Sequence, residues 1–579
     1  MQKDDNARWG SDVIAETIRD LGYEHVALVP GSSFRGLHDS IVNHLGNSDP
    51  RLVMCLHELQ AVLIAVGYAR TTDQPMAVAL HANVGLMNGT MGIFEGWCER
   101  RPMLIIGATG PVDAHARRPW IDWVHTAKDQ ASMIRAYVKW DDQPASAEAA
   151  VEAVLRADQI TRSEPFGPVY VCLDAGMQEA RLDREVHVPP VARYRPAPAP
   201  AAPAESVAQV LDLLRRAKRP AILFGRGARG QAEWDARVAL TEATGALALS
   251  TTHNPSNFPT THPSHLLAPM GEHADEQESE VLAECDLLLG FDWHDLAGFL
   301  KARGGGYQTQ TPVDATVVHC SLDSLLANGW SMDHQALAAV DVPIMAAPDR
   351  FIRQLLDALG DERLPARLPD LPHWTEAAKA KRETLREENL RVFDLSFMVS
   401  DFAKTRPVTL ARTPFGWSQL ACDHHDPMDF LGKDAGGTVG SGPGHTVGAA
   451  LALKGSGRLV IGIIGDGDFA MGNQALWTAS HMDLPMMLII ANNHSYFNDE
   501  RHQEHVARDR GRPVGNKWIG QRIDPAVDNC AMARAQGFEA FGPVTTASEF
   551  RQRLEEGARI VEAGGRVLID VQVVGGYGE

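Results

Sequence analysis

The chain has 579 residues, of which 44% are hydrophobic and 22% charged, a composition typical of a globular protein with several domains. Its 54 basic and 74 acidic residues give a net charge of −20. This charge argues against a nucleic acid or an anionic membrane as partner, because like charges repel. A small anionic substrate is still compatible with it, since one pocket can be locally positive.

The sequence predicts a cytoplasmic protein. It contains no run of about 18 uncharged apolar residues, so we expect no membrane-spanning helix. The first residues include acids and no apolar segment, which predicts that there is no secretory signal. The seven cysteines are scattered and form no CxxC pair, a pattern typical of reduced core thiols rather than disulfides or a zinc site.

Three blocks of short apolar runs alternate with helical segments, which predicts parallel sheets covered on both faces. We expect an α/β protein with three doubly wound domains, over residues 8–188, 203–362 and 390–579. A Pro/Ala-rich segment at 188–205 is expected to be an extended spacer. A second domain boundary, at 362–374, is less distinct in the sequence and precedes an expected charged helix over 375–392. The expected strands are 25–30, 76–81, 102–110, 169–174, 221–225, 285–290, 316–321, 458–464, 484–490 and 566–574.

The most informative motif is GDGD at 465–468, after the expected strand 458–464. A helix over 470–482 and a strand over 484–490 follow, so Asp466 and Asn493 are predicted at the carboxyl ends of adjacent strands, where ligands bind. Carboxylate, amide and carbonyl oxygens suit Mg²⁺, and Gly465 and Gly467 allow a diphosphate to approach closely. Alone, a GDG or an Asn-Asn pair is often only a turn.

The spacing between GDG and Asn493 resembles the thiamine diphosphate motif. This resemblance implies that the side chains of Asp466 and Asn493 and the carbonyl of Ser495 ligate Mg²⁺. It also places Gly465, Gly467, Asp468 and Tyr496 at the cofactor. Tyr496 opens the run YFNDERHQEH, which departs from the small residues common there and implies a different pocket roof.

A buried carboxyl group is needed beside the aminopyrimidine ring of such a cofactor, and Glu58 is the candidate. It opens an expected helix whose remaining face is almost wholly apolar. An acid in a first turn can also simply favour the helix dipole. However, the segment HELQAVLIAVGYAR resembles the pyrimidine-binding domain of the 2-oxo acid decarboxylase and acetolactate synthase superfamily, in which this glutamate is the activator.

The segment AGGTVGSGPGHTVGAALAL, at 435–453, is similar to the part of that superfamily that precedes the GDG strand. The resemblance implies that the carbonyl of Gly437 binds the aminopyrimidine and that Val439 lies beneath the cofactor and bends it. Valine is smaller than the usual residue, and the loop is about two residues longer than usual.

Three stretches resemble benzoylformate decarboxylase. PGSS makes Ser32 a candidate for binding a substrate oxygen, and the strand-ending Leu-His makes His81 a candidate acid–base group, although a core imidazole is the alternative. GFDWHD offers His294 as a second active-site histidine, with imperfect spacing. In the segment 117–126, Trp120, Trp123 and His125 are expected to line an aromatic pocket or to contact a partner subunit.

The resemblance covers nearly the whole chain. It implies a thiamine-diphosphate-dependent lyase or transferase that breaks or makes a C–C bond beside a carbonyl of a small molecule, foremost as a 2-oxo acid decarboxylase or carboligase. The alternatives are CO₂-free cleavage of 1,2-diketones or acyloins, and a non-catalytic paralogue. It further implies a homodimer or homotetramer with active sites at subunit interfaces. The segment RGARG is too weak a signal to support FAD in the central domain.

Overall fold

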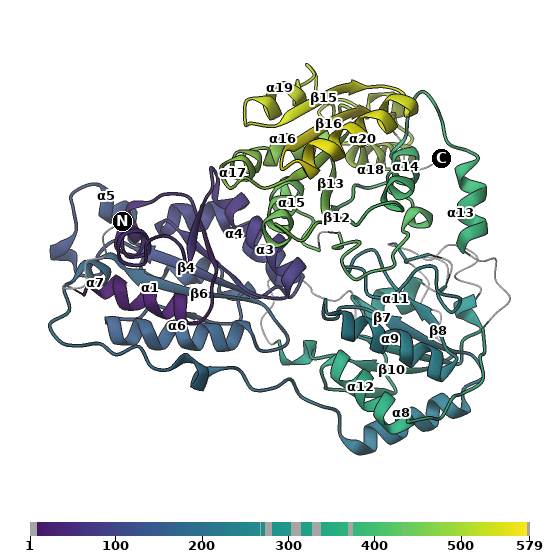
Figure 1. Cartoon of the computed structure of the whole chain (residues 1–579), viewed down its shortest axis with the longest axis horizontal. Helices are drawn as coiled ribbons and strands as arrows, with labels where there is room; N and C mark the ends of the chain where they lie inside the picture. Colours follow the sequence, from purple (N-terminus) through teal and green to yellow (C-terminus); the bar gives the residue numbers. More distant parts are fainter. Residues whose placement is uncertain are drawn as a thin grey trace.

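The computed structural model describes residues 8–266, 268–271, 281–302, 314–326, 337–368, 374–433 and 435–575. Three parallel β-sheets, each with flanking helices, follow one another along the chain (Figure 1), which confirms the predicted α/β fold class. The exact domain boundaries stay a prediction. In the described ranges, no helix is both long and apolar enough to cross a bilayer.

The first sheet has the strand order β2-β1-β3-β4-β6-β5. Its strands are β1 His25–Leu28, β2 Arg51–Met54, β3 Met76–Leu80, β4 Met103–Thr109, β5 Asp141–Asp142 and β6 Pro168–Asp174. The helices of this part are α1 Gly10–Asp20, α2 Arg35–Asp39, α3 Glu58–Thr72, α4 Ala82–Cys98, α5 Ile121–Val124, α6 Ala147–Thr161 and α7 Ala175–Glu179.

The central sheet has the order β11-β10-β9-β7-β8. Its strands are β7 Pro220–Phe224, β8 Leu247–Leu249, β9 Leu287–Phe291, β10 Thr316–Cys320 and β11 Val342–Ile344. The helices around it are α8 Ala204–Arg216, α9 Gln231–Thr244, α11 Leu296–Ala302 and α12 Pro348–Leu359.

The third sheet has the order β12-β13-β14-β16-β15. Its strands are β12 Val408–Arg412, β13 Leu459–Gly465, β14 Met486–Asn492, β15 Glu539–Val544 and β16 Arg566–Gln572. The helices are α13 Trp374–Arg382, α14 Val392–Ala403, α15 Ser441–Ala452, α16 Asp466–Gly472, α17 Ala475–His481, α18 Phe497–Asp509, α19 Asn529–Arg534 and α20 Ala547–Glu562.

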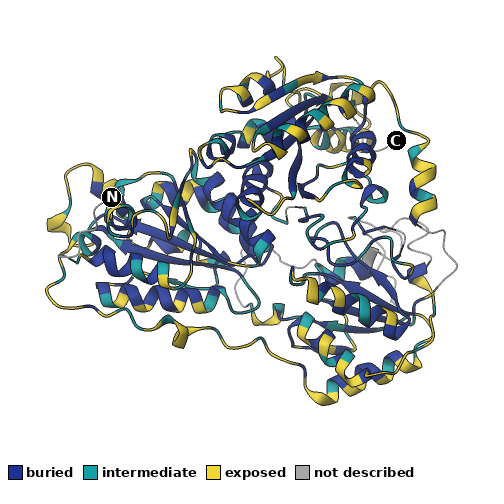
Figure 2. Cartoon of the chain, in the orientation of Figure 1, coloured by how far each residue is buried: buried dark blue, intermediate teal, exposed yellow. Residues whose placement is uncertain are grey.

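The apolar runs form strands because helices cover both faces of each sheet. Every residue of β3, β4, β7 and β14 is buried (Figure 2). A parallel strand buried on both faces needs apolar side chains throughout. These strands therefore appear in the sequence as continuous apolar runs rather than as alternating apolar and polar residues. Since the strands are parallel, their carboxyl ends meet at one edge of each sheet, where the candidate residues lie.

Helices α3 and α15 join the first and third sheets, and their backbones are in direct contact. A Cβ atom at Gly67 would clash with the carbonyl of His445, and one at Gly448 would clash with the carbonyl of Ile64. One hydrophobic core includes Val62 of α3 and Val447 of α15 together with buried strand residues of both sheets. The helix that carries Glu58 is therefore packed rigidly against the third sheet.

Several expected elements differ in detail. The helix expected over 470–482 consists of α16 and α17, which are separated at Asn473 and Gln474. The charged helix expected over 375–392 ends already at Arg382. Part of the second predicted boundary, 369–373, lies outside the described residues. The short strands β2, β5, β8, β11, β12 and β15 have too few residues or too mixed a composition to stand out in the sequence.

Candidate functional site

The carboxyl ends of β13 and β14 bring Asp466 and Asn493 together. Asp466 is the first residue of α16 and is 5% exposed, and Asn493 follows β14 directly. Burial raises the pKa of Asp466 to about 6, although the backbone N–H groups of Asn493 and Gly467 donate to its carboxylate. A buried carboxylate of this kind is stabilised in its ionised form by a bound cation. The oxygen donors therefore fit a hard divalent metal such as Mg²⁺.

The segment after Asn493 is tightly folded. The Oδ1 atom of Asn493 accepts a hydrogen bond of 3.0 Å from the backbone N–H of Ser495, which orients the amide. The hydroxyl of Ser495 donates to the buried carboxylate of Glu500 at 2.6 Å. The ring of Tyr496 lies so close to Gly467 that a side chain there would clash with it. Most of the run YFNDERHQEH, which is expected to form a different pocket roof, lies in helix α18, and this helix is mostly exposed apart from Glu500.

Asp468 contacts the candidate cofactor loop rather than the metal ligands. Its Oδ1 atom accepts from the backbone N–H of Gly440 at 2.6 Å and from that of Gly442 at 3.3 Å. Gly437 has a φ of +67°, a left-handed conformation that suits glycine. The side chain of Val439 is 45% exposed and is therefore accessible from the edge of the sheet.

At the corresponding edge of the first sheet, Glu58 begins helix α3 and is half-buried. Its Oε2 atom accepts a hydrogen bond of 3.1 Å from the side-chain amide of Asn88 in α4. His57 is the N-cap of α3, and its Nδ1 atom accepts from the backbone N–H of Leu59 at 3.1 Å. Asn88 thus holds the carboxylate of Glu58, and His57 caps the helix that carries it.

His81 follows β3 at the same edge and contacts Ser33, the residue after the candidate Ser32. The Oγ atom of Ser33 lies 2.9 Å from Nδ1 of His81, and the backbone N–H of Ser33 donates to the same nitrogen at 3.4 Å. Because a backbone N–H can only donate, Nδ1 is the acceptor, and the neutral ring carries its proton on Nε2. Ser32 is half-buried beside this contact.

A second histidine, His125, completes this group. Its ring meets that of His81 edge-on, with 4.6 Å between the centroids. The pKa of His81 is lowered, first by burial and then by His125, whereas the carboxylate of Glu58 opposes this shift. The nearby Trp120 and Trp123 are 80% and 63% exposed in this chain. His81, His125 and Glu58 therefore form one electrostatically coupled cluster.

His294 belongs to a different cluster. Its ring stacks on that of His253 at a centroid distance of 6.3 Å, and burial, with the nearby Arg226, lowers its pKa to about 3. The structure therefore does not bring His294 to His81 within one chain, and its catalytic role stays a prediction.

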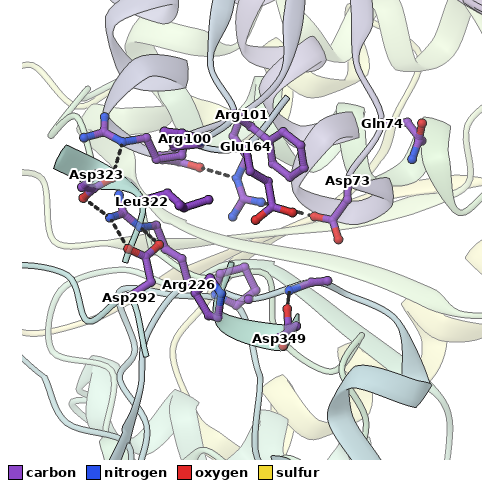
Figure 3. Close-up of a pocket in the computed structure, with 17 residues that line it drawn as sticks. Asp73, Gln74, Arg100, Arg101, Glu164, Arg226, Asp292, Leu322, Asp323 and Asp349 are labelled. Carbon is purple, nitrogen blue, oxygen red and sulfur yellow. Dashed lines mark hydrogen bonds and ion pairs between the residues drawn. The ribbon is translucent and has the colours of Figure 1, made fainter. Parts of the chain in front are cut away.

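A charged crevice between the first and central sheets lies beside His294 (Figure 3). In it, Arg226 forms ion pairs with Asp292 and Asp323, and Arg100 also pairs with Asp323. Glu164 approaches this crevice from the first sheet.

Three family models match the chain in order. They are the N-terminal TPP binding domain of thiamine pyrophosphate enzymes at residues 8–133, the central domain at 207–355 and the C-terminal TPP binding domain at 414–571.

Individual relatives match along most of the chain. Benzoylformate decarboxylase of Pseudomonas aeruginosa is 28% identical over 90% of this chain and 92% of its own length. The acetolactate synthase large subunit of Haemophilus influenzae is 24% identical over 84% of this chain and 82% of its own length. The solved structure of a thiamine diphosphate-dependent 4-hydroxybenzoylformate decarboxylase from Rhodococcus jostii has a TM-score of 0.76 and 22% identity. That match covers 98% of this chain and all of the other. The chain belongs to the thiamine pyrophosphate enzymes of the 2-oxo acid decarboxylase and acetolactate synthase type.

Proposed function

We propose that this enzyme releases CO₂ from a 2-oxo acid and can transfer the remaining carbon unit to a second carbonyl compound. The observation that carries the proposal is the cluster of Glu58, His81 and His125 at one sheet edge, in which each ionisable group is placed to influence proton transfer. Decarboxylation needs a group that donates or accepts a proton at the reacting carbon after CO₂ leaves. A neutral imidazole suits this task near pH 7.

The donor set at the third sheet supports Mg²⁺ as the metal. In the proposal, Asp466, the side-chain oxygen of Asn493 and the carbonyl of Ser495 hold the ion. Gly465 leaves space for the diphosphate, because an added Cβ there would meet nothing, whereas the ring of Tyr496 covers Gly467. Asp468 supports this site indirectly, because it holds the backbone of Gly440.

Bound thiamine diphosphate supplies a nucleophilic carbon and an electron sink. Glu58 would exchange a proton with the aminopyrimidine ring, and Asn88 would keep its carboxylate in place. The carbonyl of Gly437 would accept from the same ring, and Val439 would support the cofactor from below. These roles rest on the resemblance together with the exposure of Val439 and the left-handed conformation of Gly437.

His81 is proposed as the acid–base group that faces the substrate. Its Nδ1 atom accepts from Ser33, so Nε2 is the atom that gives or takes a proton. Burial, followed by His125, lowers the pKa of His81, which favours the neutral ring. Ser32 lies beside this group and is proposed to bind a carboxylate or carbonyl oxygen of the substrate. His294 would act only in a site that a second subunit completes.

A homodimer or homotetramer is proposed, because both sheet edges expose apolar side chains. Such surfaces on a single chain are suited to burial between subunits. The exposed residues at the first sheet include Leu56, Val84, Met87, Trp120 and Trp123, and those at the third include Phe415, Val439, Met471, Trp518 and Ile519. The cytoplasm is the proposed compartment, supported by the free state of all seven cysteines.

A substrate panel tests the proposal. Enzyme loaded with thiamine diphosphate and Mg²⁺ is incubated with benzoylformate, pyruvate, benzoin and a cyclic dione, while CO₂ and the organic products are measured. The proposal predicts CO₂ from at least one 2-oxo acid and none from the other two substrates. Cleavage of benzoin or the dione without turnover of either 2-oxo acid would favour the CO₂-free lyase or hydrolase instead.

A further inference from the structure

The peptide unit of Gly440 is held from two sides. Its N–H donates to Asp468 of the third sheet at 2.6 Å, and its carbonyl accepts from Nε2 of Gln60 at 2.9 Å. Gln60 is 1% exposed and lies in α3, two residues after Glu58. Gly440 has a φ of +97° and is the N-cap of α15, so it closes the loop 436–440 that contains Gly437 and Val439.

The other end of this loop contacts a buried carboxylate–imidazole pair (Glu95 and His445). A Cβ atom at Gly436 would lie 3.0 Å from Cα of Glu95 in helix α4. The carboxylate of Glu95 lies 3.0 Å from Nε2 of His445, in the second turn of α15, and both side chains are 0% exposed. The first-sheet domain therefore contacts the loop 436–440 at its beginning through Glu95 and at its end through Gln60 (helices α3, α4 and α15 in Figure 1).

The surroundings of this pair argue against a metal. Among the residues that the structure describes, the cluster of His, Cys, Asp and Glu with metal-ligand spacing is Glu95, Glu99 and His445. However, the guanidinium of Arg70 pairs with Glu99, with a hydrogen bond of 2.6 Å from Nε, and lies 3.6 Å from Glu95. The arginine already supplies the positive charge that a metal ion would bring.

A buried pair of this kind defines geometry more than it adds stability. Two apolar side chains of similar volume often stabilise a core equally well, because burial of both charges carries a large desolvation penalty. The pair instead joins two helices at a defined distance, beside a loop whose backbone must present one carbonyl accurately. Gln60 adds a directional hydrogen bond at the opposite end of that loop.

We propose that Gln60 and the Glu95–His445 pair are positioning residues that hold the loop 436–440 against the aminopyrimidine end of the cofactor. The inference rests on the proposed roles of Gly437 and Val439. None of the three side chains needs to touch the cofactor, since they act through the loop backbone. Helix α3 then carries both the proposed activating acid and the residue that fixes the loop.

The test compares two ligands that differ in the part that the loop would contact. Apo enzyme is titrated with thiamine diphosphate or with inorganic diphosphate, each with Mg²⁺, and binding is followed by calorimetry. The variants are Gln60→Met, which keeps the side-chain length but cannot donate, and the double variant Glu95→Leu with His445→Leu. The control is Thr478→Val, which removes a different hydrogen bond across the same junction, the 3.0 Å bond to the carbonyl of Met54.

Loss of a directional contact is expected to weaken thiamine diphosphate binding roughly tenfold in each variant, while inorganic diphosphate binds as in the wild type. The control should bind both ligands normally, and the apo melting temperatures show whether each variant is folded. Equal affinity of wild type and variants for thiamine diphosphate would overturn the inference, as would an equal loss for both ligands. Failure of the wild type itself to bind thiamine diphosphate would instead refute the proposed function.

Discussion

The hydroxyl oxygen of Ser33 lies 2.9 Å from Nδ1 of His81, and the backbone N–H of the same serine donates to that nitrogen at 3.4 Å. The hydroxyl oxygen also accepts from the backbone N–H of Ala82 at 3.1 Å. Because Nδ1 accepts from the backbone N–H and therefore carries no proton, the hydroxyl donates to the imidazole. One serine therefore fixes both the orientation and the tautomer of the proposed acid–base group.

Replacing Ser33 should impair the chemical step. We expect Ser33→Ala to lower kcat about tenfold, because the ring of His81 loses one hydrogen bond that selects its tautomer. Ser32→Ala should mainly raise KM if Ser32 binds the substrate. Steady-state kinetics on both variants checks this division, and a larger loss of kcat in Ser32→Ala than in Ser33→Ala would contradict it.

The contact between His81 and His125 predicts a change in pH dependence. The pKa of His81 is lowered by burial first and by His125 second, so the ring stays neutral to a lower pH than an exposed histidine. His125→Phe keeps an aromatic ring but removes that influence, so the pKa of His81 should rise. If turnover needs the neutral ring, the acidic limb of kcat/KM should move to higher pH. An unchanged or downward-shifted limb would contradict the proposed coupling.

The buried pair of Arg70 and Glu99 should matter for stability. Their side chains are 1% and 5% exposed. Glu99→Gln leaves a buried guanidinium without its main carboxylate, which should reduce the apparent free energy of unfolding by about 3 kcal/mol. Glu152→Gln is the control, because the Arg156–Glu152 pair is 54% and 59% exposed and such pairs contribute about 0.5 kcal/mol or less. Urea denaturation of both variants measures the contrast, and equal effects would contradict it.

The raised pKa of Glu164 predicts that the melting temperature of the protein depends on pH. Burial, followed by repulsion from Asp349, Asp292 and Asp73, raises its pKa from 4.5 to about 7, and only Lys139 opposes this. The folded protein therefore binds a proton that the unfolded chain releases, so the stability present below about pH 4.5 is lost as the pH rises through 7. Glu164→Gln should raise the melting temperature at pH 8 relative to wild type. An identical pH profile for both proteins would refute the shift.

Much of the architecture could be predicted because buried parallel strands are continuous apolar runs. Asp466, Asn493 and His81 each follow such a run directly, so their position at a sheet edge follows from the strand assignment. Glu58 was recognisable as the single acid at the start of an apolar helix. The family and the cofactor could be predicted from these same positions, and the family matches confirm them.

The contacts that could not be predicted depend on turns and on distant segments. Ser33 reaches His81 because the turn Ser32–Phe34 is a 3-10 helix that buries Ser33 and Phe34, and the burial of one serine of a Ser-Ser pair has no signal in the composition. His125 lies directly after the short helix α5, in the connection that follows β4. The Glu95–His445 pair joins residues 350 positions apart, and only the folded chain brings the two side chains together.

The most direct measurement is the rate at which the proton at C2 of bound thiamine diphosphate exchanges with solvent deuterium, in the wild type and in Glu58→Gln. If Glu58 activates the cofactor, exchange on the wild-type enzyme is fast, and the variant exchanges at least about a hundredfold more slowly while it still binds cofactor and Mg²⁺. Equal exchange rates in the two proteins, with the cofactor bound in both, would contradict the account.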